Sequence, residues 1–537
     1  MPSPPARRNE TKLQEKKRKR EEEKAIAKIK ASKQFQRRRR GYDPEDLTDE
    51  DEAARVIFEA NVASLPGQME NCDLCETRFT VTAYSRAGPN GGLLCPKCSK
   101  ELDKEDGVKK KKKAAARPNR RQVASQILDG IYRSGAKDLM TLCIETLAKN
   151  VDLAEDFGDL PLKLIDRLAA ILSKKRLITS TTLDLFIKSV QDTVTIYEGA
   201  KLNSDDLIRV FQMMPNLKHF RTRNAIQFKN KVMDYLTGCP VTLESFSIHG
   251  ANLIDDEHWN NFLLEKGRYL RTLKVYYTDG HFGDEQLELL KVTCPEIVRL
   301  KVSHNQKATD EGIMHIASLP ALQHLSLELY KTTSSETYVE ILNSIGYGLR
   351  TFSLETVHYI DDSVLEAIHE NCIQLSKLRL TDNETFTDGG FVNLFKDWSN
   401  PPLTYIDFSK ARHIDATEPS ENKENIGLCS NGFGALMAHS GSQLEFLNVM
   451  SCRHISKEAF ENVFSEKKKY PELRHVDVSF CWGVNDFVVG SIFRSCPNLK
   501  TLKIFGNMKV SEVKVPKGKI LIGMPNAIGM QIEGEDD

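Results

Sequence analysis

Four cysteines in the N-terminal part of the chain have the spacing of metal ligands. Cys72 and Cys75 form one Cys-x2-Cys pair, and Cys95 and Cys98 form a second pair after 19 intervening residues. Each pair turns two thiolates toward one point, and two pairs supply the tetrahedral sulfur shell that Zn2+ prefers. Because four sulfur ligands leave no open coordination position, we expect a structural zinc ion here and no metal-based catalysis.

The segment around these cysteines is predicted to fold as a treble clef. A strand-like run at 80–84 and a Gly-rich turn at 88–92 lie between the two pairs, and a helix is expected to begin near Ser99. Residues 66–105 contain little apolar core, so the module should need its metal in order to fold. The basic run at 109–113 does not decide whether the module contacts DNA or protein.

A second group of residues has the spacing of a partner-binding helix. Leu139, Cys143 and Leu147 follow at intervals of four and therefore share one helix face, with the small Cys between two leucines. This element resembles the elongin-C-binding box of ubiquitin-ligase receptors, although Asp138 stands where that box usually has Thr, Ser or Pro. The resemblance implies that the three residues contact elongin C. The alternative is an amphipathic helix that buries the same face in a core.

Another helix is predicted to begin shortly after this one. A proline suits the start of a helix, and the leucines around it continue one apolar face. The arrangement resembles the cullin-contacting box that follows the elongin-C-binding box in ubiquitin-ligase receptors. Further helices are expected at 179–190 and after the polar run 203–206. The residues of the cullin-box-like element are Leu160, Pro161, Leu164 and Leu168.

The second half of the chain is an internal repeat. The pattern Leu-x-x-Leu-x-apolar, with Ile, Val or Phe as replacements, recurs at a step of about 26 residues. This period predicts an α/β fold, a leucine-rich-repeat solenoid in which each repeat adds a strand and a helix to one core. The repeats begin at Leu217, Leu243, Leu270, Ile297, Leu322, Leu349, Leu375, Leu403, Leu444, Leu473 and Leu499.

Two details of the repeats refine this prediction. Asn305, Asn383, Cys452 and Cys481 follow their strands at the same position, an alternation of Asn and Cys that matches the ladder position of the repeat. It marks the cysteine-containing type, which resembles the repeats of F-box ubiquitin-ligase receptors. One step, from Leu403 to the next repeat, is 41 residues long, and we expect the polar surplus near 416–430 to form a mobile loop.

The outward side chains of the strands form a candidate interaction surface. They mix both charges with aromatic rings, which suits a protein partner better than a phosphate backbone. The alternative is that each residue is simply a solvated position of the sheet. The residues include Lys274, Lys301, Arg379, Lys503, Asp407, Asp477, Tyr276, Tyr277, His304, Tyr405, Phe446 and Phe480.

The N-terminal residues segregate charge, although the net charge of the whole chain is zero. Residues 1–40 carry 16 Lys and Arg against five Glu, and residues 41–60 carry eight acids against one Arg. Such blocks repel themselves, so a disordered tail is expected. Two basic clusters in it resemble nuclear import signals and predict a nuclear protein; a solubilising tail is the alternative. The clusters are Lys16, Lys17, Arg18, Lys19 and Arg20, and Arg37, Arg38, Arg39 and Arg40.

Other classes of protein are disfavoured. No apolar run approaches the roughly 18 residues that span a bilayer, and no secretory signal is visible. Twelve cysteines without such a signal indicate a reducing compartment. The phosphate-binding loop, the nucleophile elbow, the HExxH zinc motif and the dinucleotide-binding glycine motif are absent from the sequence, so we do not expect an enzyme.

The predicted organisation has five parts. A disordered tail (1–65) and a zinc-binding treble clef (66–105) are followed by a basic linker (106–118). A helical, elongin-C-binding-like segment (119–212) then leads into the cysteine-type leucine-rich-repeat solenoid (213–537).

This combination resembles the fungal Rad-seven family of DNA repair proteins. The resemblance covers residues 66–537 and rests on the zinc module joined to a helical segment that reads D-L-M-T-L-C-I-E-T-L-A-K-N. It implies a non-catalytic role in global-genome nucleotide excision repair of non-transcribed chromatin. The implied partners are a Swi/Snf-type ATPase with a RING finger, elongin C and a cullin, with damaged DNA contacted directly or through them. Two alternatives stay open: an F-box-like receptor of a degradative ligase without a repair role, and a direct DNA-binding protein that uses the zinc module and the tail.

Overall fold

The computed structural model describes residues 69–72, 74–80, 85, 94–99, 139–187, 191–414, 418, 421–524 and 531–533. The expectations for the basic tail, its two import clusters and the linker fall outside these residues. The described residues divide into two compact units. The first contains residues 147–296 and 304–307, and the second contains the described residues before 147 together with 297–303 and 308–533.

Short helices precede the repeats. Thr179 caps one of them through a reciprocal pair of hydrogen bonds with Thr182, but that helix ends after four residues and continues as a 3-10 turn. The expectation of one continuous helix over 179–190 is therefore wrong for its described part. No helix among the described residues is long and apolar enough to cross a membrane. These elements are α6 (Leu139–Lys149), η2 (Val151–Leu153), α7 (Leu162–Lys174), α8 (Ser180–Leu183) and η3 (Asp184–Phe186).

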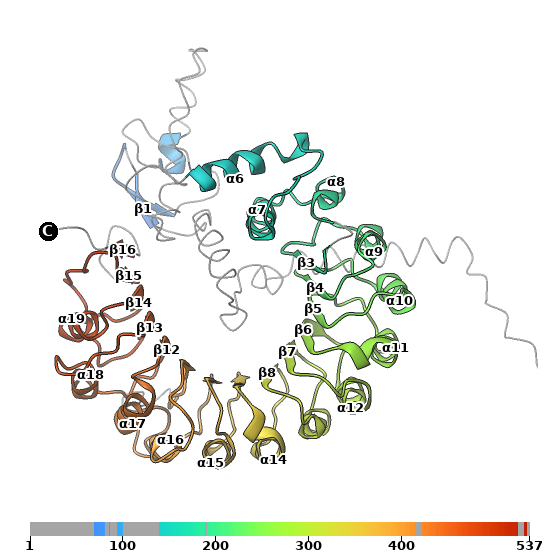
Figure 1. The fold of residues 1–537 in the computed structure, drawn as a ribbon. Coiled ribbons are helices and arrows are strands. Elements are labelled where there is room, and N and C mark those ends of the chain that lie inside the picture. Colours follow the sequence, from blue (N-terminus) through green and yellow to red (C-terminus); the bar gives the residue numbers. More distant parts are fainter. Residues whose placement is uncertain are drawn as a thin grey trace, which may run out of the picture. The chain divides into compact units, whose positions relative to one another are not determined.

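Strands and helices alternate in the first unit. Its strands pair in parallel in chain order. In Figure 1 its helices lie on one side of the strands. The strands are β3 (Thr193–Ile196), β4 (His219–Thr222), β5 (Ser245–His249) and β6 (Thr272–Asp279). The helices are α9 (Ser204–Met213), α10 (Asn230–Gly238), α11 (Asp256–Lys266), η4 (Gly267–Tyr269) and α12 (Asp284–Thr293).

The second unit continues the same alternation. Its strands from β8 to β15 are parallel, and β16 adds antiparallel to β15. The strands are β7 (Arg299–Asn305), β8 (His324–Leu329), β9 (Thr351–Glu355), β10 (Lys377–Leu380), β11 (Tyr405–Asp407), β12 (Phe446–Asn448), β13 (His475–Asp477), β14 (Thr501–Lys503), β15 (Ile520–Ile522) and β16 (Gln531–Glu533). The helices are α13 (Asp310–Met314), η5 (His315–Ser318), α14 (Ser335–Ile345), η6 (Gly346–Gly348), α15 (Asp362–Asn371), α16 (Asp388–Phe395), α17 (Ser430–Ser440), α18 (Lys457–Val463) and α19 (Asp486–Ser495).

The leucine-rich-repeat fold is confirmed. All eleven repeat-start residues are at most 2% exposed, and each stands two residues before the start of a strand, from β4 to β14. Within each unit the described strands follow one another in chain order, and β3 to β6 form the sheet of the first unit. The sheet begins with β3, one strand before the first repeat found in the sequence. That strand was missed because Gln191 stands where the other repeats have Leu or Ile.

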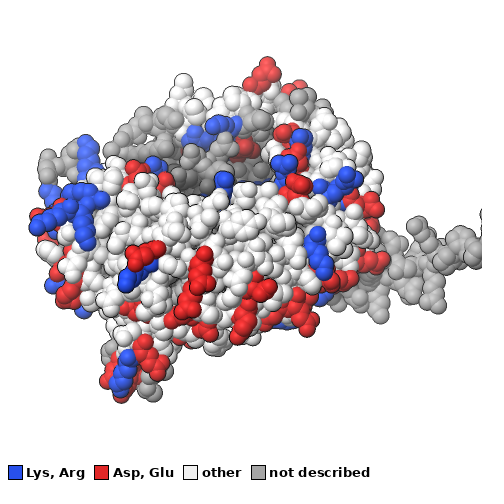
Figure 2. Space-filling view, turned by 60° about the horizontal axis from the view of Figure 1, so that its bottom comes forward, with Lys and Arg blue, Asp and Glu red and all other residues white. Residues whose placement is uncertain are grey.

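The helical side of the repeats carries mixed charge. Figure 2 shows acidic side chains gathered near the middle of the face that it presents, and Lys and Arg side chains closer to its edges. Duplex DNA is normally met by a continuous basic stripe, because its phosphates repeat along both strands. This face has no such stripe among the described residues.

The Asn/Cys position after the strands closes the loops of the preceding repeat. Asn383 is fully buried, and its Nδ2 donates to the carbonyl oxygens of Val357 and Ile360, both at 2.8 Å. Cys452 and Cys481 each make one such hydrogen bond. The Sγ atom of each donates to a carbonyl oxygen of the preceding repeat, at 3.2 and 3.1 Å respectively. The side chains thus satisfy backbone groups that would otherwise be buried without a partner.

Replacing Asn383 with Ala should lower the free energy of unfolding by at least about 2 kcal/mol, because each buried polar group left without a partner costs about 1–3 kcal/mol. The change removes two donors to carbonyls and the oxygen that accepts from the backbone N–H groups of Thr385 and Phe386. Chemical denaturation followed by circular dichroism measures the loss. Asn343→Ala, at an exposed position with one side-chain hydrogen bond, is the control and should change stability by less than about 0.5 kcal/mol. Equal losses in the two variants would contradict the ladder argument.

The long step after Leu403 forms regular hydrogen bonds in its described part. In its described part, the side chain of Asn422 exchanges two hydrogen bonds of 2.8 Å with the backbone of Ile426. Two single antiparallel β-bridges follow, one between Ile426 and Thr387 and one between Gly427 and Arg412. These hydrogen bonds attach the described stretch 421–430 to the neighbouring repeat, and the mobility expected for the insertion stays a prediction.

Candidate metal centre and partner-binding helix

The first cysteine pair lies on a turn between two short strands. β1 (Met69–Asn71) and β2 (Arg78–Thr80) pair antiparallel. Between them the N–H of Cys72 donates to Thr77 O at 3.0 Å, and the N–H of Glu76 donates to Cys72 O at 2.9 Å. Glu76 has a left-handed backbone, with φ of 55°, which turns the chain so that Cys75 faces back toward Cys72.

The second pair stands at the start of a helical turn formed by residues 96–99. Here the N–H of Ser99 donates to Cys95 O at 3.0 Å. Cys72 and Cys95 are buried together with Phe79 and Leu94 in a small cluster of their own. With so few apolar residues, the cluster can bury little surface, and it is a weak source of stability on its own.

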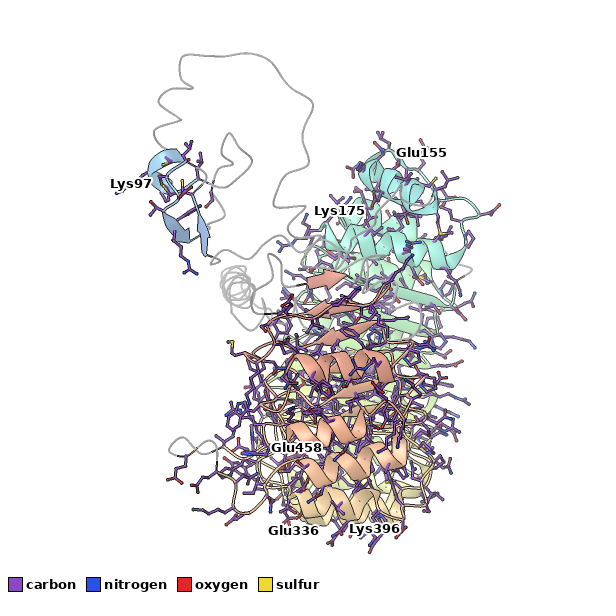
Figure 3. The ribbon with its side chains drawn as sticks, turned by 90° about the vertical axis from the view of Figure 1, so that its left-hand side faces the viewer. Lys97, Glu155, Lys175, Glu336, Lys396 and Glu458 are labelled. Carbon is purple, nitrogen blue, oxygen red and sulfur yellow. The ribbon has the colours of Figure 1, made fainter. Side chains whose placement is uncertain are left out.

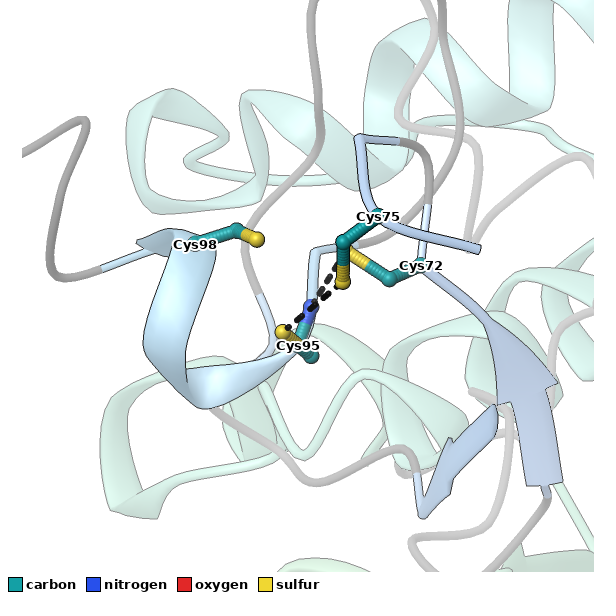
Figure 4. A group of neighbouring side chains, drawn as sticks. All are labelled: Cys72, Cys75, Cys95 and Cys98. Atoms are coloured by element: carbon teal, nitrogen blue, oxygen red, sulfur yellow. Dashed lines mark hydrogen bonds between the residues drawn. The ribbon is translucent and has the colours of Figure 1, made fainter. Parts of the chain in front are cut away.

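The four sulfur atoms converge. All four Sγ atoms lie within 4.8 Å of one another, and Cys75 Sγ is 3.7 Å from Cys95 Sγ (Figure 4). Four sulfurs at about 2.3 Å from one zinc ion in tetrahedral geometry would be about 3.8 Å apart. The backbone N–H of Cys95 also donates to Cys72 Sγ at 3.2 Å. The donor set and its spacing therefore fit one tetrahedral Zn2+.

The four thiols do not ionise alike. Burial opposes ionisation of Cys72, but the backbone N–H groups of Cys95, Leu74 and Cys75 donate to its sulfur and lower its pKa to about 6. The pKa of Cys98 is raised, first by its side-chain contacts with Cys75 and Cys95. One thiolate forms readily here while another resists ionisation, because negative charge accumulates among the sulfurs. A divalent cation between them removes that obstacle.

Helix α6 carries the predicted elongin C contacts on an exposed face. Leu139 is 77% exposed, Leu147 is 37% exposed and Cys143 is also exposed, whereas Ile144 and Ala148 on the other side of the helix are buried. Contiguous exposed apolar side chains on a soluble protein mark an interaction site. Sequence reasoning missed two members of this face, because it followed only positions four apart. The face, called the α6 apolar face below, consists of Leu139, Met140, Leu142, Cys143 and Leu147.

The cullin-box-like residues at helix α7 differ in their exposure to solvent. Pro161 is exposed at the N-cap of the helix, with φ of −55° and ψ of 141°, and Leu160 and Leu164 are half-buried. Leu168 is only 1% exposed and belongs to the core. It lies on the same stripe as Leu172, which is fully buried, so the helical period that made Leu168 a candidate contact places it inside instead. Leu168 is thus unavailable to a partner.

The outward strand residues pair with one another more than expected. Arg379 is 2% exposed; its guanidinium lies 2.8 Å from Glu355 Oε1, donates to the Tyr405 hydroxyl at 2.6 Å and lies 3.4 Å from Asp407 Oδ2. Burial lowers the pKa of Lys301 to about 8. Burial also raises the pKa of Asp407, and the positive charge of Arg379 partly offsets this rise. These side chains form a buried charge network inside the second unit, called the Arg379 network below.

The remaining cysteines and many aspartates are structural. Burial raises the pKa of Cys372 and Cys496 to about 12, which keeps both thiols neutral and unreactive. Asp388 lies between two repeats and accepts from the backbone N–H groups of Cys429 and Gly432 at the start of α17, at 2.9 and 2.8 Å. Such a carboxylate stabilises a helix N-terminus.

Comparisons with known proteins agree with these features. Residues 66–104 match the family model of the DNA repair protein rhp7 treble clef domain. The chain is 25% identical to the DNA repair protein rhp7 of Schizosaccharomyces pombe, over 87% of this chain and 80% of that protein. It is 24% identical to the DNA repair protein RAD7 of Saccharomyces cerevisiae, over 88% and 84% of the two chains. Over most of its length the chain is similar to DNA repair proteins of the Rad7 and rhp7 type.

A solved structure supports the fold of this chain. A chain in the crystal structure of the Rad7 and Elc1 complex in yeast superposes with a TM-score of 0.59 and 20% identity. The match covers 72% of this chain and 98% of that one. The treble clef predicted from the sequence thus matches a domain of rhp7, and the repeat fold matches that of the Rad7 chain in this complex.

Proposed function

We propose that this chain, which is similar to DNA repair proteins of the Rad7 and rhp7 type, is a non-catalytic adaptor in global-genome nucleotide excision repair. In this proposal it acts in the nucleus and joins an elongin C–cullin ubiquitin ligase to a damage-recognition complex that contains a Swi/Snf-type ATPase with a RING finger. The relatives that support the repair role are both named DNA repair proteins. The observation that carries the adaptor role is the α6 apolar face, which is exposed on a formed helix.

The chemistry of the α6 apolar face suits a hydrophobic groove on elongin C. A protein of the same fold was solved in complex with Elc1, which supports a partner of this kind. Two large leucines flank the small Cys143, so the partner can approach the helix backbone closely between them. Lys149, which is exposed at the C-terminal end of the same helix, would add a polar contact at the rim of this face.

We assign the cullin contact to the N-terminal end of α7. Pro161 is exposed there, and Leu160 and Leu164 keep part of their surface accessible. Leu168 is left out of this assignment because it is buried. The contact area is therefore smaller than the sequence pattern suggested, and elongin C binding is the better supported of the two proposed interactions.

We also propose that a structural zinc ion stabilises the treble-clef module. Cys72, Cys75, Cys95 and Cys98 would hold it, and with all four positions taken by sulfur it would supply a cross-link and no Lewis-acid chemistry. The cross-link would join the β1–β2 turn to the helical turn at 96–99. In this way the small apolar cluster of the module would be kept together.

The test of the adaptor role is elongin C binding by the full-length chain. Leu139→Asp combined with Cys143→Asp places two charges on the α6 apolar face and should weaken binding at least about 100-fold, which corresponds to about 2.7 kcal/mol. Co-purification and isothermal titration measure the change. The matched control is Leu153→Asp, because Leu153 is 82% exposed in η2, outside this face. It should bind like the wild type.

Circular dichroism must show that the double variant keeps its helices. Wild-type protein that does not bind elongin C would overturn the adaptor role. Equal binding by the double variant and the wild type would show that elongin C uses another surface of the chain.

A further inference from the structure

The loops that follow strands β11 to β14 differ in composition from those of earlier repeats. Counted from two residues after each strand, they are the six-residue segments 409–414, 450–455, 479–484 and 505–510. Together they contain four Lys and Arg, two His and no Asp or Glu. The corresponding segments after β9 and β10, 357–362 and 382–387, contain four acids and no Lys or Arg. The net charge of these loops therefore changes from negative to positive between β10 and β11.

These four loops lie on one edge of the sheet. Parallel strands end on the same side, and the pairs β11–β12, β12–β13 and β13–β14 are all parallel. Figure 3 labels Glu336 and Glu458, in the first turns of α14 and α18, on one edge, and Lys396, after the end of α16, on the other. The loops that lead into these helices lie along the edge marked by Glu336 and Glu458.

Large apolar side chains project from the same loops. Phe480 is 47% exposed, Trp482 is 40% exposed and Met508 is 80% exposed. The ring of Phe480 lies over Gly506, where a Cβ atom would come within 2.3 Å of it, so the glycine leaves room for the ring at the surface. Exposed apolar side chains next to cations mark an interaction surface. We call Arg412, Arg453, Phe480, Trp482, Met508 and Lys509 the cationic-aromatic edge.

The cations are placed against the aromatic residues. The guanidinium of Arg453 lies 5.6 Å from the centre of the Trp482 ring, and Lys509 Nζ donates to Trp482 O at 3.0 Å. Among the described residues, Arg412 Nε and His454 Nε2 are buried and have no hydrogen-bond partner. One edge thus combines flat apolar faces, positive charge and two polar nitrogens without a partner.

We propose that the cationic-aromatic edge binds single-stranded nucleic acid, with bases stacked on Trp482 and Phe480 and phosphates held by Arg412, Arg453 and Lys509. Stacking on aromatic side chains beside a positively charged track is the common mode of single-strand binding, and it tolerates any sequence. Neighbouring loops follow the strand spacing of about 4.8 Å. Phe480 and Trp482 both belong to the loop 479–484, so neighbouring bases would stack there while the flanking phosphates reach the cations of the adjacent loops.

Duplex DNA and an acidic protein segment fit this edge less well. In a duplex the base faces are stacked on one another and cannot reach Trp482 or Phe480. An acidic segment would satisfy the cations but would leave the two aromatic rings without a planar partner. The proposal is independent of elongin C binding by α6, and it differs from DNA binding by the zinc module or the tail.

Intrinsic fluorescence isolates this site within the full-length chain. Of the three tryptophans, all described, Trp259 and Trp398 are buried and only Trp482 is substantially exposed. An oligothymidylate of about ten nucleotides should quench Trp482. An abasic strand of the same length, which keeps the charge and lacks the bases, should require about tenfold higher concentration or more. The basic tail contains no tryptophan, so its own DNA binding does not produce this signal.

Two variants and a control complete the test. Phe480→Ala with Arg453→Ala keeps the Trp482 reporter and should shift the quenching midpoint about tenfold or more. Trp482→Phe should abolish quenching while retaining binding. Tyr359→Ala is the control, because Tyr359 is 66% exposed in the acid-bearing loop after β9, and it should leave the midpoint unchanged. Circular dichroism checks the fold of each variant.

Three results would overturn the proposal. The first is an absence of quenching in the wild type. The second is equal quenching by the abasic strand or by a polyglutamate peptide of matched charge, which would mean that bases are not recognised and that an acidic protein is the better partner. The third is an unchanged midpoint in the Phe480→Ala, Arg453→Ala variant.

Discussion

Replacing Cys95 and Cys98 with Ser is expected to reduce bound zinc from about one ion per chain to nearly none and to unfold residues 66–105. Serine hydroxyls are poor zinc ligands, and the remaining pair, Cys72 and Cys75, supplies only half of the coordination shell. Without the ion, the module retains the three-residue strands β1 and β2 and a small apolar cluster, which is too little to keep it folded.

Native mass spectrometry and atomic absorption measure the zinc content of the purified chain. Limited proteolysis reports the unfolding, with new cleavage sites confined to residues 66–105. Cys143→Ser is the matched control, since this cysteine is exposed on α6 and should leave the zinc content unchanged. Wild-type protein purified without zinc that resists proteolysis in this region would contradict the metal assignment. Thermal unfolding of the repeats should be the same in all three proteins, because the affected contacts lie within the module.

Replacing Arg379 with Leu should lower the free energy of unfolding by about 3–5 kcal/mol, the range for removing one partner of a buried ion pair. The loss comes from Glu355 and Asp407, which would keep their negative charge near one another without the guanidinium. The hydroxyl of Tyr405 would also lose its donor. Denaturant unfolding at neutral pH measures the change.

The pH dependence separates this electrostatic cause from a simple packing defect. Burial already raises the pKa of Asp407 in the folded chain, and removing Arg379 raises it further. A carboxyl group with a raised folded pKa binds its proton more tightly in the folded state, so lowering the pH relieves the cost. The deficit of Arg379→Leu should therefore shrink as the pH falls from about 7 toward about 4.

The control for Arg379 comes from the same column of the sheet. Lys503 lies 3.8 Å from Asp477 but is partly exposed, so Lys503→Leu should cost less than about 1 kcal/mol. A deficit of Arg379→Leu that does not change with pH would mean that lost packing, and not uncompensated charge, destabilises the variant.

Several parts of the structure were predictable because they depend on local pattern. The repeat-start leucines recur at a fixed step, and burial of every one follows from stacking identical units. The two Cys-x2-Cys pairs bring their thiols together because each pair is a tight turn. The ladder position was recognisable for the same reason, since Asn383 and Cys452 occupy equivalent positions in their repeats.

Other parts depend on neighbours that the pattern does not identify. A helical period shows which residues share a face and not whether that face is buried, so it could not separate exposed Leu139 from buried Leu168. The Arg379 network joins β9, β10 and β11, and its existence follows from the register between strands, in which Arg379 stands opposite Asp407. Of the cationic-aromatic edge the sequence analysis named only Phe480, because its members come from separate loops that are 26 to 41 residues apart in the sequence.

The two sides of α6 also have a kinetic consequence. Ile144 and Ala148 are buried in the chain by itself, so the helix that carries the α6 apolar face is already formed before any partner arrives. Ordering a backbone costs about 1–2 kcal/mol per residue, and a preorganised helix does not incur that cost during association. Encounter should therefore resemble rigid docking, with little heat-capacity change beyond that of the contact surface itself. Substitutions on this face should then act mainly on the lifetime of the complex and leave its rate of formation almost unchanged.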